Sequence, residues 1–198
     1  AIAVGFGVGM NAVAAFHLGA KQEDKANDAV SVSMVLTLVH GIVMTLLFLL
    51  LAPSFLSLFT EDAVILQYGT TYSYIVFSFV IPYFISITLE KLFQAEGQMT
   101  VSMLCMSVGC VVNIILDPFL IFGIGPFPKL EVAGAAWATG IGQVASLLLY
   151  VILYFAKKQP LKIRFRKEMW NKNLCKRIYA VGIPATINLG LPSLLITA

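Results

Sequence analysis

One carboxylate stands within a long apolar stretch of this chain, and its neighbours could bind an ion with it. Asp117 lies in the run Asn113-Ile-Ile-Leu-Asp-Pro118, well inside the apolar residues 100–123. A charged side chain at the centre of a bilayer costs about 2.5–3.5 kcal/mol on insertion scales, so such a residue usually faces the protein interior and belongs to an ion, proton or substrate pathway. The alternative is a structural aspartate that ties helices together by hydrogen bonds.

The residues around Asp117 favour the ion-binding interpretation. Asn113 lies four residues earlier, so the two side chains share one face of a helix. Pro118 has no N–H to donate to the carbonyl of Ile114, which leaves that carbonyl free and kinks the helix. An amide oxygen, a free carbonyl and a carboxylate are hard oxygen ligands, which suit a small cation. The pattern predicts a site for Na⁺, H⁺ or both, with helix kinks at Pro118 and at Pro82.

The composition indicates that the elements carrying this site cross a membrane. Hydrophobic residues make up 59% of the 198 residues and charged residues only 12%, with a mean hydropathy of +0.90. A soluble domain usually has about a quarter of its residues charged. We expect an all-α, polytopic transmembrane bundle built from windows of about 20 apolar residues. The expected spans are residues 1–20, 30–51 (ended by Pro53), 67–93, 100–123 and 132–155, with a sixth beginning near residue 177. Because both ends of the chain fall inside apolar runs, we expect a fragment of a longer protein.

The distribution of basic residues predicts the orientation of the spans. Nine of the 13 Lys and Arg residues fall between residues 157 and 177. Alternate connections place 12 of the 13 on one side and Lys129 alone on the other, which predicts a cytoplasmic loop at residues 157–177. This loop also separates an amino-terminal part from the residues that follow. Its residues 161–166 alternate apolar and basic side chains, so it either lies along the anionic inner leaflet or is an ordinary positive-inside loop. The same placement argues against a nucleic-acid partner.

Small residues predict where helices pack closely. Gly5 and Gly9 form a GxxxG pair, and Gly134, Ala138, Gly142 and Ser146 repeat every four residues along one face. Polar residues near the span ends, Glu90 and Lys91, are expected to reach the interface rather than to act in a site. The three cysteines and two histidines lack the spacing of a zinc site. No nucleophile and base or metal-ligand set lies at membrane depth, so we expect no enzyme and no cofactor.

The motifs together resemble the MATE family of multidrug and toxic-compound extrusion transporters. The residues that carry the resemblance are Gln94-Ala-Glu-Gly-Gln98, then Asn113-Ile-Ile-Leu-Asp117-Pro-Phe-Leu-Ile-Phe-Gly123, then Val132-Ala-Gly-Ala-Ala-Trp-Ala-Thr139, and finally Gly182-Ile-Pro-Ala185. The resemblance implies two six-helix lobes joined by a cytoplasmic loop. Residues 1–155 would be helices two to six of the amino-terminal lobe, residues 156–176 the basic loop, and residues 177–198 the start of the carboxy-terminal lobe.

The resemblance also implies a function and completes the predicted site. The family's cation or proton site falls on Asn113, Asp117 and Thr139, where Thr139 alone would suggest helix packing. A further acidic residue on the family's first helix has no counterpart here. We expect an antiporter in the cell membrane, coupled to H⁺ or Na⁺, that exports small organic and often cationic compounds, with membrane lipid and the missing helices as its other partners. The alternatives are a flippase of lipid-linked saccharides and a helical receptor or scaffold without transport.

Overall fold

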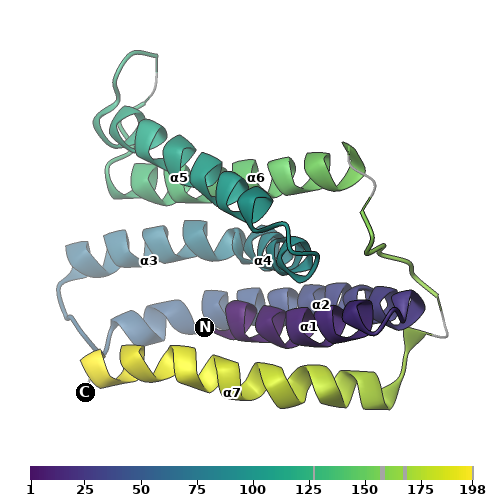
Figure 1. Cartoon of the computed structure of the whole chain (residues 1–198). Helices are drawn as coiled ribbons and strands as arrows, with labels where there is room; N and C mark the ends of the chain where they lie inside the picture. The colour runs from purple at the N-terminus through teal and green to yellow at the C-terminus, as the bar shows by residue number, and fades with distance from the viewer. Residues whose placement is uncertain (127, 157–158, 167–168, 198) are drawn as a thin grey trace. The chain divides into compact units, whose positions relative to one another are not determined.

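The computed structural model describes residues 1–126, 128–156, 159–166 and 169–197, and these ranges contain helices and no strand, which confirms the all-α prediction (Figure 1). The helices are α1 (Ile2–Gly19), α2 (Glu23–Leu56), α3 (Ala63–Ser78), α4 (Val80–Ala95), α5 (Met99–Phe122), α6 (Val132–Ala156) and α7 (Lys172–Thr197). Four of them, α1, α2, α5 and α6, are long and apolar enough to cross a membrane, and α3 with α4 could form a fifth, broken span. For α7, membrane crossing stays a prediction.

Three of the predicted boundaries are wrong for identifiable physical reasons. The polar turn expected before residue 30 is shorter, because α2 begins at Glu23. Glu23 and Asp24 in its first turn stabilise the helix, since their negative charges interact favourably with the positive end of the helix dipole. Pro53 does not end α2, since it loses a donor but keeps its carbonyl, which accepts the N–H of Ser57 at 3.0 Å. The last helix starts at Lys172 rather than 177, because the side chain of Asn171 accepts the N–H of Asn173 at 2.9 Å and caps it.

The contacts divide the chain into two compact units. Unit 1 consists of Ala1–Val39, Phe84–Met103 and Tyr150–Ala198, and therefore holds α1 and α7. Unit 2 consists of His40–Tyr83 and Leu104–Leu149, and therefore holds α3 and most of α5 and α6. Large apolar side chains remain exposed in unit 2, among them Leu50 with 75% of its surface exposed. Such a surface suits lipid or further helices rather than water.

In unit 1, α1 and α7 lie side by side with their backbones in close contact (Figure 1). A Cβ atom at Gly9 would collide with the carbonyl oxygen of Ile178 and would lie 2.9 Å from the backbone nitrogen of Gly182. A Cβ at Gly5 would collide with Thr186 in the same way. The prediction that the GxxxG pair lets another helix approach closely is confirmed.

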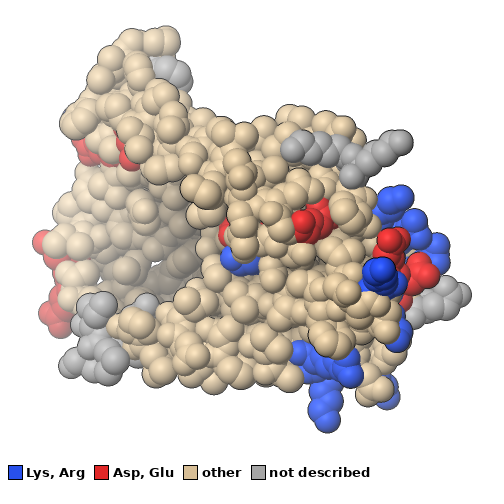
Figure 2. Space-filling model, in the orientation of Figure 1, with Lys and Arg blue, Asp and Glu red and all other residues tan. Residues whose placement is uncertain are grey.

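The connection between α6 and α7 is fastened to unit 1 by its own backbone. Four successive N–H groups donate to side chains: Leu161 to Glu96 at 2.9 Å, Lys162 to Asn27 at 2.7 Å, Ile163 to Tyr154 at 2.8 Å and Arg164 to Ser31 at 2.8 Å. The side chain of Leu161 is fully buried. Figure 2 shows Lys and Arg side chains gathered at the right-hand end of the view, where this connection lies. Residues 161–164 of the connection are thus a fixed part of unit 1, and the side chains of Lys162 and Arg166 are exposed.

We expect Gly9→Ala to destabilise the full-length protein by about 1–3 kcal/mol, because the added methyl group would push α7 away from α1. Gly19→Ala, at the last residue of α1, is the matched control, since a Cβ there meets nothing within 4 Å. The thermal stability of both detergent-purified variants is measured by heating each protein and then quantifying the remaining folded protein by size-exclusion chromatography. Equal stability of the two variants would contradict the close packing.

We expect the stability contributed by Glu96 to fall as the pH rises. Burial of this carboxyl group raises its pKa above the ordinary 4.5, although the hydrogen bonds from Leu161 and Gln98 act in the opposite direction. A carboxyl group whose pKa is raised by folding stabilises the folded protein at pH values below the pKa that the group has in the unfolded chain. This contribution to stability is lost as the pH rises through the pKa of the folded state. The melting temperature of the wild type relative to Glu96→Gln should therefore decrease from pH 4.5 upwards, whereas Glu61→Gln, at an exposed carboxylate, serves as the control. A constant or rising difference for Glu96→Gln would contradict this result.

Candidate functional site

In unit 2, α5 and α6 pack closely through small residues, which brings two of the predicted site residues, Asn113 and Thr139, together. A Cβ at Gly142 would lie 2.7 Å from the carbonyl oxygen of Gly109, and one at Gly134 would collide with the carbonyl oxygen of Leu120. The hydroxyl of Ser146 donates to the carbonyl of Cys105 at 2.6 Å. Residue numbers rise along α6 as they fall along α5, so the helices run antiparallel. The small-residue stripe is confirmed as a packing surface.

Asp117 has a buried oxygen atom without a partner in the protein. Its Oδ1 atom is one of two buried side-chain oxygens, with that of Ser33, that have no hydrogen-bond partner among the described residues. Buried polar atoms in proteins are almost always hydrogen-bonded, so each exception calls for an explanation such as a bound ion or water. The residue lies within α5, which continues through Pro118 to Phe122. The carboxylate is therefore held at span depth by a helix and not by hydrogen bonds to its Oδ1 atom.

Asn113 and Thr139 meet across the interface of α5 and α6. The Asn113 Nδ2 atom lies 3.5 Å from the hydroxyl oxygen of Thr139, at the long limit of a hydrogen bond. That hydroxyl donates to the carbonyl of Ala135 at 2.9 Å. Within the described ranges, no hydrogen bond joins Asp117 to either residue, although Asn113 precedes it by one helical turn. The structure thus pairs two of the predicted site residues directly and places the third one turn along α5.

This arrangement offers oxygen atoms of four chemical kinds within two adjoining helices. They are the unpartnered carboxylate oxygen of Asp117, the amide and hydroxyl of Asn113 and Thr139, and the carbonyl of Ile114, to which Pro118 cannot donate. Such a set fits a proton on the carboxylate or a small hard cation shared with the neighbouring oxygens. No group of three or more His, Cys, Asp or Glu side chains that could hold a metal ion occurs in the part of the chain that the structure describes.

The break between α3 and α4 contacts α6 beside Thr139. The two helices are interrupted at Phe79, and Pro82 lies in the first turn of α4, where the N–H it lacks is not needed by the helix. The ring of Phe79 stands edge-on to Trp137 with centroids 5.7 Å apart, and a Cβ at Gly140 would collide with it. Phe79 was not among the residues predicted from the sequence. The signal was available in Gly140, a glycine that falls outside the four-residue stripe.

Glu90 and Lys91 form a polar cluster in unit 1, in which Glu90 is buried and Lys91 partly buried, so the expectation that Glu90 reaches the interface is wrong. Glu90 is 5% exposed, and its Oε1 atom accepts from Lys91 Nζ at 3.0 Å and from Gln94 Nε2 at 2.7 Å. The stem of Lys91 fills the space that a Cβ at Gly7 would need. The physical reason is that a missing side chain on α1 opens room for the lysine inside unit 1. Its ammonium group is paired with a carboxylate there.

Comparison with known proteins agrees with these features. A family model described as MatE matches residues 1–119. The multidrug export protein MepA of Staphylococcus haemolyticus is 32% identical over 183 residues, which cover 91% of this chain and 39% of MepA. The probable multidrug resistance protein YoeA of Bacillus subtilis is 28% identical over 195 residues, which cover 96% of this chain and 42% of YoeA. The chain spans about two fifths of the length of these curated relatives.

Solved structures show the same fold. The structure described as the inward-facing conformation of a multidrug resistance MATE family transporter of the MOP superfamily has a TM-score of 0.87 and 25% sequence identity to this chain. The match covers 94% of this chain and 42% of that chain. A second structure, of a MATE protein in the bent conformation, has a TM-score of 0.90 at 24% identity, with 98% and 43% of the two chains covered.

Proposed function

Since this chain belongs to the MATE family, whose members are membrane transport proteins and not enzymes, we propose that it forms part of a cation-coupled antiporter. The whole protein would export small organic, often cationic, compounds by alternating access. The relatives named multidrug export and multidrug resistance proteins support this substrate class. The coupling ion would be H⁺ or Na⁺.

The observation that carries the proposal is the unpartnered Oδ1 atom of Asp117. A carboxylate at membrane depth is costly to maintain, and a structural aspartate would repay that cost with hydrogen bonds to its neighbours. The absence of such a bond at Oδ1, within the described ranges, favours an oxygen kept available for an exchangeable ion. Asn113 and Thr139 would complete the ion's oxygen ligands from the adjoining turn of α5 and from α6.

Ion binding would act by changing the relative stability of two conformations. A ligand shifts such an equilibrium only by the difference between its affinities for the two states. A proton or Na⁺ at Asp117 removes a buried net charge, so it favours the conformation in which the carboxylate is least solvated. The helices would bend near Pro118 and near Phe79, one turn before Pro82. Phe79 contacts α6 beside Thr139. A movement at the break between α3 and α4 would therefore shift α6 near Thr139.

The proposal includes the placement of the chain in the cell membrane. Residues 1–155 would form five spans of the amino-terminal lobe, with α3 and α4 together as one broken span. Residues 156–176 would be the connection between the lobes, and residues 177–198 the beginning of the carboxy-terminal lobe. The basic residues 157–177 would face the cytoplasm. An acidic residue on a preceding helix would share the ion with Asp117, and the remaining helices would supply much of the substrate cavity.

The partly buried Lys91 bears on the alternative of a lipid-linked saccharide flippase. A flippase of that kind needs unpaired basic groups inside its cavity to bind a pyrophosphate. Lys91 is partly buried in unit 1, but Glu90 lies 3.0 Å from its ammonium nitrogen and neutralises it. The drug antiporter is therefore favoured over the flippase. A receptor or scaffold without transport would show no ion-dependent flux.

We expect Asp117→Asn to reduce ion-driven export in the full-length protein by about tenfold or more, since couplings between transported ligands are worth about 5–150-fold. The assay is efflux of the organic cation ethidium from proteoliposomes under an imposed proton or sodium gradient. The matched control is Asp62→Asn, because Asp62 caps α3 through its side chain and asparagine caps equally well. Undiminished gradient-driven efflux by Asp117→Asn would contradict the proposed mechanism.

A further inference from the structure

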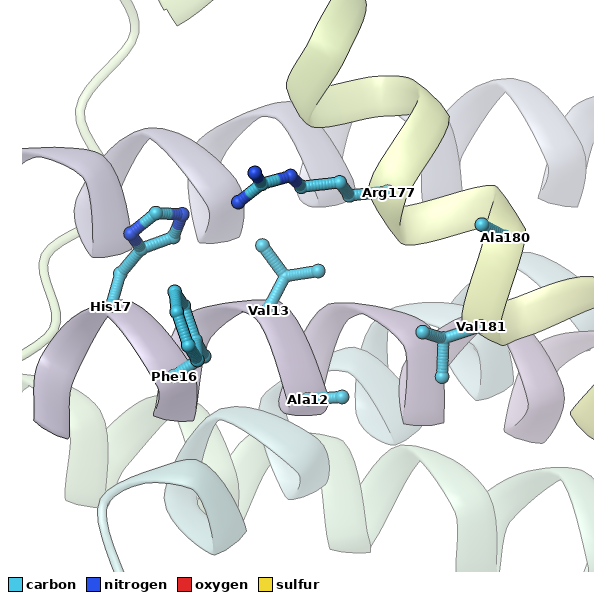
Figure 3. Close-up of a pocket in the computed structure, with 7 residues that line it drawn as sticks. All are labelled: Ala12, Val13, Phe16, His17, Arg177, Ala180 and Val181. Carbon is cyan, nitrogen blue, oxygen red and sulfur yellow. The ribbon is translucent and has the colours of Figure 1, made fainter. Parts of the chain in front are cut away.

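An apolar groove runs between α1 and α7 in unit 1, with a basic side chain at one end (Figure 3). Its volume is about 390 Å³, and it is lined by Ala12, Val13, Phe16, His17, Arg177, Ala180 and Val181. Four of these residues are small or aliphatic, which makes the floor of the groove apolar. Figure 3 shows the guanidinium group of Arg177 extending along α1 toward the imidazole of His17.

A second cavity continues from the basic end of the groove and is polar. It has a volume of about 230 Å³ and shares His17 and Arg177 with the groove. Its other lining residues are Lys25, Asp28, Asn171, Asn173 and Leu174. Among the described residues, neither Lys25 nor Arg177 forms an ion pair with an acidic side chain. The two cavities together form an amphipathic site, with basic side chains at one end and the apolar groove at the other.

We propose that this site binds an anionic phospholipid, with its phosphate between Arg177 and Lys25 and an acyl chain in the groove between α1 and α7. Charge complementarity supports this occupant, because two basic side chains without acidic partners face one acid, Asp28, at the polar end. The apolar rim is exposed in the manner of a lipid-facing surface, with Phe16 65% exposed. A guanidinium group also matches the geometry of a phosphate better than an ammonium does.

The position of Arg177 distinguishes this site from a diffuse basic surface. Arg177 lies about one turn into α7. Its position is fixed because Asn171 caps the start of this helix and Gly182 packs closely against α1. Lys176, the preceding residue, is also exposed but lines neither cavity. A lipid held only by the general positive charge of this segment would respond alike to both residues. A lipid held in the site would respond to Arg177 alone.

The test measures lipid binding to the purified full-length protein by native mass spectrometry. Dioleoyl phosphatidylglycerol and dioleoyl phosphatidylcholine are titrated separately against the wild type and three variants. Arg177→Gln should weaken phosphatidylglycerol binding about 5-fold, the effect of one basic group near a membrane surface. Ala180→Leu, which fills the groove without a change of charge, should weaken it by a similar factor. Lys176→Gln should bind as the wild type does, and phosphatidylcholine should bind more weakly throughout.

Several results would overturn the proposal. Equal losses in Arg177→Gln and Lys176→Gln would indicate a diffuse basic surface. Equal binding of the two lipids by the wild type, or no change in Arg177→Gln, would exclude a site for an anionic headgroup. Displacement of the lipid by glycerol 3-phosphate, with no effect of Ala180→Leu, would indicate a soluble phosphate as the ligand. An absence of bound phosphatidylglycerol would indicate that other helices of the full-length chain cover the groove.

Discussion

The short distance between α5 and α6 is the constraint on which the candidate site depends. Lipid provides no hydrophobic force that would drive two apolar helices together, so their association relies on close packing and hydrogen bonds. Gly109 and Gly142 bring the two backbones close enough that a side chain at either would meet backbone atoms of the other helix. At this distance Asn113 on α5 reaches Thr139 on α6. A bulkier residue in the stripe would separate the helices and remove the second helix's contribution to the site.

Asp117 differs from other polar groups of this molecule in its hydrogen bonding. The connection between α6 and α7 crosses unit 1 in an irregular conformation, yet four of its successive N–H groups find side-chain acceptors. The buried Glu90 is likewise paired with Lys91 and Gln94. Against this background, a buried side-chain oxygen that lacks a partner is an exception among the residues that the structure describes, where Asp117 shares it only with the hydroxyl of Ser33. At Asp117, an exchangeable ion offers an explanation for this exception.

The helices and the small-residue contacts could be predicted because each depends on a local pattern. Long apolar runs specify the spans, and glycines four residues apart specify a close-packed face whatever helix meets it. The grouping of Asn113 with Asp117 follows from one helical turn, whereas Thr139 was added through a family resemblance. Local patterns could not reveal contacts between distant residues. The position of the Lys91 side chain depends on the missing side chain of Gly7, and the anchoring of Lys162 depends on Asn27, 135 residues earlier in the chain. The packing of the Phe79 ring similarly depends on space provided by Gly140.

The central claim is that Asp117 holds an ion that the exported compound displaces, and the most direct measurement is ion release. Ethidium is added to the detergent-purified full-length protein in weakly buffered solution, while a pH electrode and a sodium electrode record released ions. The account predicts that the wild type and Asp62→Asn release H⁺ or Na⁺ in proportion to bound ethidium, and that Asp117→Asn binds ethidium without this release. Equal release from Asp117→Asn and the wild type would contradict the account.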